Sequence, residues 1–292
     1  MEGGDVWPRK KFFRSRVNFS NPQKIESILK NNFHGGFPVV MSSGRAGIAT
    51  LVRLFYKCDS IRIFPYASQC VVESLINSNC TPLTPIDKSN LDISYNQWGR
   101  YNSFLRNSPF LEDSVDSFYP IGSKILRSGA RFELWSISKI FGLSYGAIIW
   151  CKHQTDAEVI RKERDSKNYL LKLIRILLRG TSPLSKLVYT KWQNIEYLNL
   201  GLTSLEYGQI YSCVLNWENS YKCKYNLFVK SVSDLNSSQI SLELENNNII
   251  PVVIEIPTNL KNRLQKSSKD LHRIVTKKQP ISVRIIPYQV EN

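Results

Sequence analysis

Short apolar runs alternate with helix-like segments from residue 38 onward, and this alternation limits the fold more than any other feature. Strands are expected at 38–41 (PVVM), 61–64 (IRIF) and 81–86 (TPLTPI). Between them, residues 45–57 and 69–78 carry apolar side chains at the spacing of one helical face. A strand–helix–strand–helix–strand order is typical of a parallel sheet with helices on both faces. The sequence therefore predicts an α/β fold on a mainly parallel sheet.

The alternation is interrupted once and then resumes. Residues 88–109 are rich in Asn, Ser, Tyr and Trp and predict a long loop. Further strands are expected at 109–113 (PFLED), 130–137 (ARFELWSI) and 146–151 (GAIIWC).

The second half of the chain is predicted to be mostly helical, over 154–179 and again over 203–233. A small α+β unit follows, with strands near 249–256 and 281–287 and a helix at 261–275. We therefore divide the chain into three parts: a basic N-terminal segment (1–37), a large α/β domain (38–235, helical over 154–235) and a small C-terminal α+β domain (236–292).

The composition is that of an ordinary globular protein, with 42% hydrophobic and 22% charged residues. No apolar run is long enough to span a membrane, and no apolar core follows the charged N-terminus, so we expect a cytoplasmic protein. The six cysteines form no CxxC pair, which favours reduced thiols. No metal site is expected because the histidines lie far apart in the sequence, at His34, His153 and His272.

The chain carries 39 Lys and Arg against 24 Asp and Glu, a formal net charge of +15. This excess suits an anionic partner, which could be a nucleic acid, a membrane surface or a phosphorylated small molecule. The charge is spread along the chain, and no nucleic-acid-binding motif occurs, so no nucleic-acid partner is expected. One segment, 167–180, places Lys172, Arg175 and Arg179 on one face of an apolar stretch. Such a segment is either a membrane-surface helix or, more commonly, a core-packing helix with one solvated edge.

Three separated motifs carry the chemistry. The first is Ser42-Ser43-Gly44-Arg45, a strand-to-helix turn whose backbone N–H groups could cradle a phosphate, or which could be a simple helix cap. It lacks the Lys-Ser/Thr ending of a Walker loop and the GxGxxG dinucleotide pattern. The second is Asp113, at the carboxyl end of a predicted strand, where open α/β sheets bind ligands.

The third motif is the stretch 135–143 (WSISKIFGL), in which Lys139 follows an apolar strand and precedes a glycine turn. A lysine there is expected to be partly desolvated, which favours a neutral amine able to form a Schiff base. Ser136 could add a hydroxyl to a phosphate site.

Taken together, these motifs resemble fold-type I pyridoxal-phosphate (PLP) aminotransferases, most closely the DegT/DnrJ/EryC1/StrS sugar aminotransferases. The likeness is best over residues 40–165, and it rests on the order and spacing of SSGRAGIATLVRLF, LEDSVDSF and FELWSISKIFGLSYGAIIWCK. It implies that Lys139 is the Schiff-base lysine and the base that moves the proton, and that Asp113 pairs with the ring nitrogen. The other positions that it implies for cofactor binding are Ser43, Gly44, Arg45 and Ser136 at the phosphate, Gln69 beside the ring and Asp116 near the ring hydroxyl.

The chain departs from this family at several positions. Arg45 replaces a small hydroxyl residue, Gln69 replaces a stacking aromatic ring, and Asp116 replaces a glutamine near the ring hydroxyl. An acid at Asp116 would repel the phenolate unless it were protonated or turned away. Between Ile93 and Pro109 the family has a further helix and strand where this chain has a short loop, and the C-terminal domain is abbreviated.

The resemblance implies a PLP-dependent aminotransferase acting on an anionic small molecule, plausibly a nucleotide-linked keto-sugar of polysaccharide (O-antigen-like) biosynthesis. It also implies a homodimer. Two alternatives stay open. The first is a non-catalytic member of the same fold that serves as a binding or regulatory subunit. The second is a basic protein that binds membrane or nucleic acid through 167–180 and has only an ancestral likeness to these enzymes.

Overall fold

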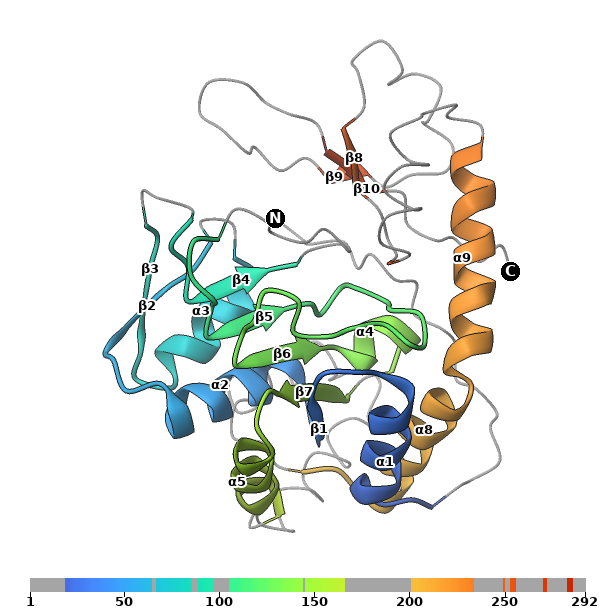
Figure 1. Cartoon of the computed structure of the whole chain (residues 1–292), viewed down its shortest axis with the longest axis horizontal. Helices are drawn as coiled ribbons and strands as arrows, with labels where there is room; N and C mark the ends of the chain where they lie inside the picture. The colour runs from blue at the N-terminus through green and yellow to red at the C-terminus, as the bar shows by residue number, and fades with distance from the viewer. Residues whose placement is uncertain are drawn as a thin grey trace, which may run out of the picture.

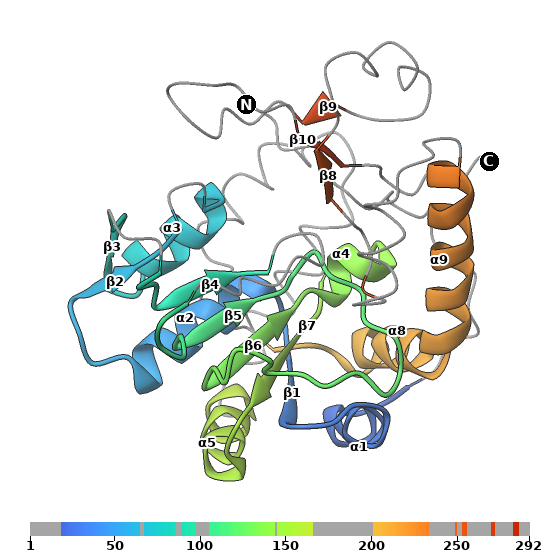
Figure 2. The same cartoon turned by 45° about the horizontal axis from the view of Figure 1, so that its top comes forward.

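The computed structural model describes residues 19–64, 67–85, 89–96, 105–143, 145–165, 201–233, 249, 253–255, 270–271 and 283–285. A five-stranded sheet in the order β1-β7-β6-β5-β4 forms its centre (Figures 1 and 2). These strands are β1 (Phe37–Met41), β4 (Ile93–Tyr95), β5 (Leu111–Asp113), β6 (Phe132–Trp135) and β7 (Ala147–Cys151).

Most strands of this sheet run in one direction. Strands β4, β5 and β6 are mutually parallel, whereas β7 is antiparallel to both of its neighbours, β6 and β1. A parallel bridge between Ile63 and Ile93 leads from β4 to the parallel pair β2 (Ser60–Arg62) and β3 (Thr81–Leu83). The predicted mainly parallel sheet is therefore confirmed, with β7 as a reversed strand.

Helices cover both faces of the sheet, and each face has its own buried cluster. The helices α2 (Gly44–Phe55), α3 (Gln69–Ile76) and α5 (Gln154–Asp165) pack on one face. The helices α1 (Pro22–Asn32), α4 (Ile137–Phe141), α8 (Ser204–Leu215) and α9 (Trp217–Ser233) pack on the other. Alternation along β7 shows the division, because Ile149 points to the first cluster whereas Ile148 and Trp150 point to the second.

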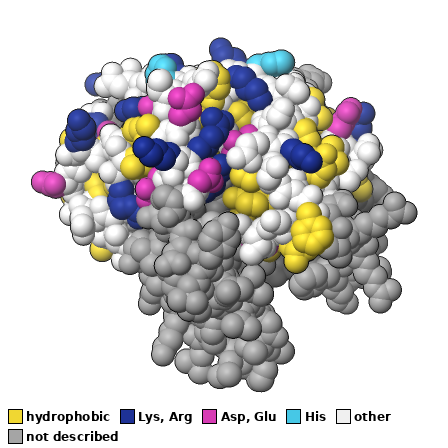
Figure 3. Space-filling model, turned by 90° about the horizontal axis from the view of Figure 1, so that it is seen from below, with side chains coloured by type: hydrophobic (Ala, Val, Ile, Leu, Met, Phe, Trp, Pro, Cys, Tyr) yellow, Lys and Arg dark blue, Asp and Glu magenta, His cyan; other side chains and the backbone are white. Residues whose placement is uncertain are grey.

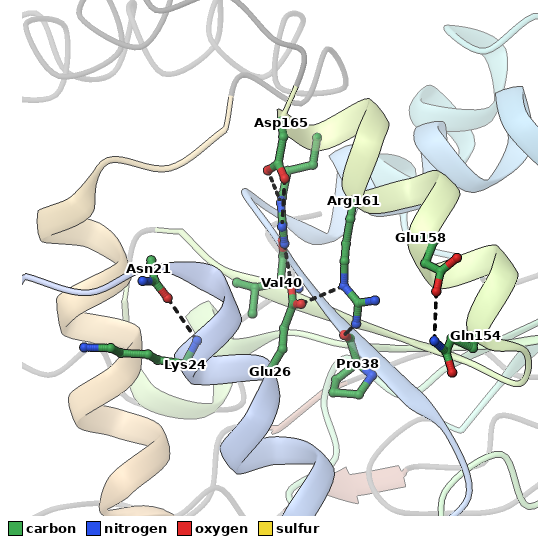
Figure 4. A network of polar contacts seen from close by, with 10 residues as sticks. Asn21, Lys24, Glu26, Pro38, Val40, Gln154, Glu158, Arg161 and Asp165 are labelled. Atoms are coloured by element: carbon green, nitrogen blue, oxygen red, sulfur yellow. Dashed lines mark hydrogen bonds and ion pairs between the residues drawn. The ribbon is translucent and has the colours of Figure 1, made fainter.

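The outer edge of β1 is covered by charged side chains from α1 and α5 (Figure 4). Glu26 accepts a hydrogen bond from the Val40 N–H at 3.0 Å and forms ion pairs with Arg161 and Arg164. The two guanidinium groups donate to the carbonyls of Pro38 and Val40, at 3.0 and 3.2 Å. Proline has no N–H to satisfy, so this edge presents few groups that need partners.

Helices α1 and α4 and strand β4 were not predicted, since residues 137–141 were expected to leave a strand and enter a glycine turn. Helix α1 lies in the basic segment before residue 37. Asn21 caps it by accepting from the Lys24 N–H at 3.0 Å, and Ile25 and Leu29 are fully buried. Strand β4 lies inside the predicted loop 88–109, so the prediction of a loop is wrong at 93–95. Between β4 and β5, where the expected shortening lies, the described residues 96 and 105–110 form neither helix nor strand.

Further differences concern the second half. The predicted helix 203–233 is two helices, because the chain breaks at Asn216 between α8 and α9. Strands β8 (Val253–Glu255) and β10 (Val283–Ile285) confirm the two predicted C-terminal strands. They form a three-stranded antiparallel sheet with β9 (Asp270–Leu271), so the helix predicted at 261–275 is wrong at those two residues.

Segment 167–180, with its basic face, lies outside the described residues. Among the described helices, none is both long enough and apolar enough to cross a membrane. On the face shown in Figure 3, Lys and Arg side chains are interspersed with Asp and Glu and do not form one basic patch.

Candidate functional site

Two of the predicted motifs meet at Gly146, just before β7. They are the turn Ser42-Ser43-Gly44 (the serine turn) and helix α4, which carries Lys139 (the lysine helix). The Gly146 N–H donates to the carbonyl of Ser42 at 2.7 Å, and the Ser138 N–H donates to the carbonyl of Gly146 at 3.0 Å. Gly146 has a φ of 99°, and a Cβ built on it would lie 2.9 Å from a side-chain carbon of Ile210. Only glycine fits this position without strain. Two backbone hydrogen bonds thus connect motifs that are almost 100 residues apart in the sequence.

Ser43 caps the start of α2. Its Oγ accepts a hydrogen bond from the Ala46 N–H at 3.1 Å, so the cap interpretation of this turn is confirmed. Gly44 and Arg45 are the first two residues of α2, and the Arg45 side chain is half-buried. A helix N-terminus carries a partial positive charge and attracts anions, so capping and phosphate binding are compatible at this position.

Asp113 is the last residue of β5 and is almost completely buried. Its Oδ1 accepts from the Val115 N–H at 3.2 Å, whereas its Oδ2 is buried without a hydrogen-bond partner among the described residues. Burial raises the pKa of Asp113 to about 7, although the nearby Lys139 ammonium acts in the opposite direction. This carboxyl therefore has one oxygen available to a buried N–H donor.

Lys139 lies on α4, which begins at the Ser136 cap and ends at Gly142 in a left-handed conformation. Its Nζ forms an ion pair with Asp116 Oδ1 at 2.9 Å, and the lysine side chain is 42% exposed. Desolvation lowers the pKa of Lys139, but the charge of Asp116, with smaller contributions from Cys70 and Asp113, raises it above its usual range overall. The neutral amine predicted from the sequence is therefore wrong for the cofactor-free protein, in which this amine is a paired ammonium.

Ser136 is nearly buried, and its Oγ lies 2.8 Å from Ser138 Oγ and accepts from the Lys139 N–H at 3.3 Å. This hydroxyl therefore orients the start of the lysine helix. Gln69 is the first residue of α3, and its side chain is not among the described groups.

A second acidic pair lies on the other face of the same strands. Glu112 on β5 and Glu133 on β6 are register partners and are both buried. Glu112 accepts from Asn96 Nδ2 at 2.9 Å and from the Ser128 N–H at 2.7 Å. Burial, followed by the charge of Glu133, raises the pKa of Glu112 to about 7. These contacts hold β5 in place at the residue just before Asp113.

Tyr95, at the end of β4, is a site residue that the sequence analysis missed. Its hydroxyl is buried without a hydrogen-bond partner among the described residues, and it lies beside Asp113 on the next strand. The only sequence signal is an aromatic residue after Ile-Ser in a segment that otherwise has loop composition.

The structure thus brings Asp113, Asp116 and Lys139 together. Asp116 forms an ion pair with Lys139, and both carboxylates are near enough to raise the pKa of the lysine. PLP has three groups that need partners: a ring nitrogen, a phosphate and an aldehyde. The partnerless Asp113 Oδ2 suits the ring N–H, and the N-terminus of α2 suits the phosphate. The residues present therefore fit this cofactor.

Comparisons with known proteins agree with this fit. Residues 25–263 match the sequence model of a family described as "Putative PLP-dependent aminotransferase". No curated protein matches the chain.

Many solved structures are similar to the chain, and two of them are PseC and NtdA. PseC from Helicobacter pylori, an aminotransferase involved in the biosynthesis of pseudoaminic acid, aligns with a TM-score of 0.58 at 11% identity, over 93% of this chain and 87% of its own. NtdA from Bacillus subtilis, with its cofactor PMP bound, aligns with a TM-score of 0.56 at 12% identity, over 92% of this chain and 73% of its own. At such low identity, the likeness shows a shared fold.

Proposed function

Because this chain belongs to the family of PLP-dependent aminotransferases, we propose that it transfers an amino group to a keto-sugar linked to a nucleotide. The acceptor would serve polysaccharide biosynthesis of the O-antigen kind. The observation that carries the proposal is the juxtaposition of Lys139 with a buried carboxyl, Asp113, that has one oxygen without a partner. An anionic nucleotide diphosphate also suits a chain with a formal net charge of +15.

Bound PLP supplies an aldehyde that takes up the amine and a ring that withdraws electrons from the reacting carbon. With PLP bound, Asp113 Oδ2 would accept from the ring N–H and keep that nitrogen protonated. Ser43, Gly44 and Arg45 at the start of α2, together with Ser136, bind the phosphate. By the resemblance, Gln69 would take the position of the aromatic residue that stacks on the ring.

Lys139 would hold the cofactor through its amine and would then move the proton of the amino donor. In the cofactor-free protein its Nζ carries an extra proton, which the amine must lose before it can bond to carbon. Asp116 Oδ1 lies 2.9 Å from Nζ and raises the pKa of this amine, so the ion pair holds the extra proton until it separates. Asp116 therefore interacts with the lysine amine. This contact directs its carboxylate away from the ring hydroxyl of PLP.

The wider setting is part of the same proposal. We place the enzyme in the cytoplasm as a homodimer, with a large PLP-binding domain (38–235) and a small C-terminal domain (236–292). A non-catalytic member of this fold is the competing interpretation, and it predicts a protein that does not take up PLP.

The decisive experiment is a titration of the purified protein with PLP, followed by visible absorbance. Borohydride treatment and peptide mapping should then place the cofactor mass on the peptide that contains Lys139. Lys139→Ala should abolish both signals, whereas Lys152→Ala, an exposed lysine after β7, should change neither. A colourless wild-type protein would favour the non-catalytic interpretation. Incubation of the loaded protein with an amino-acid donor and a nucleotide-linked keto-sugar should give the amino sugar by mass spectrometry.

A further inference from the structure

Tyr95 and Asp113 are adjacent across the sheet. They are register partners at the ends of the parallel strands β4 and β5. Register partners on parallel strands project from the same face, and neighbouring strands lie about 4.8 Å apart. Tyr95 therefore lies on the same face of the sheet as the carboxylate that we assign to the ring nitrogen.

Both side chains carry a buried polar atom without a partner. The Tyr95 hydroxyl and Asp113 Oδ2 are buried, and neither has a hydrogen-bond partner among the described residues. Buried polar groups are almost always paired, because an unpaired group loses its hydration without compensation. Two such atoms on neighbouring strand ends indicate an arrangement that is completed when a ligand binds.

The surroundings keep Tyr95 a neutral donor. Burial, followed by the charge of Asp113, raises the pKa of the Tyr95 hydroxyl well above its usual value, although the nearby Ser68 hydroxyl acts in the opposite direction. In return, the Tyr95 hydroxyl is close enough to lower the pKa of Asp113, although the pair does not meet hydrogen-bond geometry in the cofactor-free protein. Cys70 and Asp116, which also act on Lys139, raise the pKa of Tyr95 as well, so all these groups border one site.

We propose that Tyr95 is a positioning residue for Asp113: its hydroxyl donates to Asp113 Oδ2 and holds that oxygen toward the ring nitrogen of bound PLP. This inference rests on the proposed function and adds a residue to its site. One carboxylate oxygen has two lone pairs, so it can accept from both the phenol and the ring N–H. Phenol donation also favours the ionised carboxylate, which the protonated ring nitrogen needs.

The test compares the dissociation constants of PLP and of 1-deazapyridoxal phosphate, which has a carbon atom in place of the ring nitrogen. Tyr95→Phe should weaken PLP binding about tenfold, as expected for one hydrogen bond to a charged group. It should leave binding of the deaza compound unchanged, because no ring N–H is then present for Asp113. In an Asp113→Asn background, Tyr95→Phe should have no further effect on PLP.

Tyr56→Phe is the matched control. Tyr56 also contacts a carboxylate, Asp92 Oδ2 at 3.0 Å, but lies at the end of α2 and has no part in the proposed site. It should alter the binding of neither compound. Incorporation of 2,3-difluorotyrosine at position 95 is a second probe that keeps the ring and strengthens the donor, and it should tighten the binding of PLP alone.

Equal weakening of both compounds by Tyr95→Phe, or no weakening of PLP, would overturn the role of Tyr95 while leaving the proposed function standing. Failure of the wild-type protein to bind either compound would remove the proposed function and this inference with it.

Discussion

At the residue scale, Asp113 and Lys139 have protonation states that no motif could reveal. Their positions could be proposed from the sequence, because Asp113 ends a predicted strand, Lys139 follows one, and both match residues of a known family. Their charges were not, because these depend on burial and on the contact between Lys139 and Asp116, across 23 residues of sequence. In the cofactor-free protein, burial raises the pKa of the acid, and a carboxylate partner keeps the lysine charged.

Asp113 should make the stability of the cofactor-free protein depend on pH. Its pKa is about 7 in the folded protein against 3.8 as the reference, so between these values the folded state holds a proton that the unfolded chain has lost. The free energy of unfolding should therefore fall as pH rises from about 4 to about 7. Asp113→Asn cannot lose this proton, so urea denaturation from pH 5 to 8 should show a shallower decline and a variant more stable at pH 8, by on the order of a few kcal/mol.

The free energy of unfolding of the Asp113→Asn variant should still fall as pH rises, because the pKa of Glu112 is raised as well. Identical slopes for the variant and the wild-type protein would show that Asp113 is already ionised in the folded state.

Asp116 should set the pH at which Lys139 accepts the cofactor. Asp116→Asn removes the charge that contributes most to raising the pKa of Lys139, so the amine should lose its proton at lower pH. The visible absorbance of the PLP-loaded protein, followed against pH, should shift its transition to lower pH. Asp165→Asn, which changes an exposed carboxylate on α5, should leave the transition in place. An unchanged transition in Asp116→Asn would mean that the ion pair does not persist once PLP is bound.

At the element scale, a helix or strand could be predicted where its own apolar residues repeat with the period of that structure. Strand β1 and helix α2 were predicted because their apolar residues repeat over a whole segment. Strand β4 has only three residues, which is too short to show alternation, and it is a strand because β5 and the Ile63 bridge supply its hydrogen-bond partners. Helix α1 has a capping asparagine and a proline at its start, and this signal was present but overshadowed by its basic composition.

The free energy of unfolding should depend strongly on the Glu26 carboxylate at the covered edge of β1. Glu26→Gln removes the carboxylate that pairs with Arg161 and leaves the buried Arg164 with Asp165 alone, although Glu26 lies 135 or more residues away in sequence. Breaking a buried ion pair from one side costs about 3 kcal/mol or more in the free energy of unfolding. Urea denaturation at pH 7 measures this loss.

Glu158→Gln is the control for this variant. It changes an exposed carboxylate on α5, the helix that carries Arg161 and Arg164, and its hydrogen-bond partner is Gln154 (Figure 4). Its effect should stay within about 0.5 kcal/mol. Similar losses for the two variants would indicate that solvent reaches Glu26.

At the scale of the whole molecule, distant parts of the chain share one core. Trp217, at the start of α9, is fully buried, and its Nε1 donates to the carbonyl of Tyr119 at 2.7 Å. Its ring packs against Phe33 of the N-terminal part and Phe141 of the lysine helix. Sequence analysis predicted helices here but could not place them, because a pattern along the chain shows which face is apolar and not which surface covers it.

Trp217→Ala should therefore destabilise the folded protein as a unit. Removal of a buried tryptophan leaves a cavity and an unpaired carbonyl at Tyr119, so a loss of about 3–5 kcal/mol is expected. Urea unfolding followed by both far-ultraviolet circular dichroism and tryptophan fluorescence should give one transition at lower urea for the variant. Leu215→Ala, on the exposed side of α8, should change little. Two separate transitions would mean that α8 and α9 unfold independently of the sheet.

The junction at Gly146 bears on how this architecture tolerates sequence divergence. The bonds that join the serine turn to the lysine helix run from main chain to main chain, so the identities of the side chains at Ser42 and Ser138 do not enter into them. Substitutions at those two positions therefore leave these main-chain bonds in place. The distance between the phosphate site and the lysine of a bound cofactor then stays the same. Main-chain bonds of this kind remain possible in a chain that shares a fold with PseC at 11% identity.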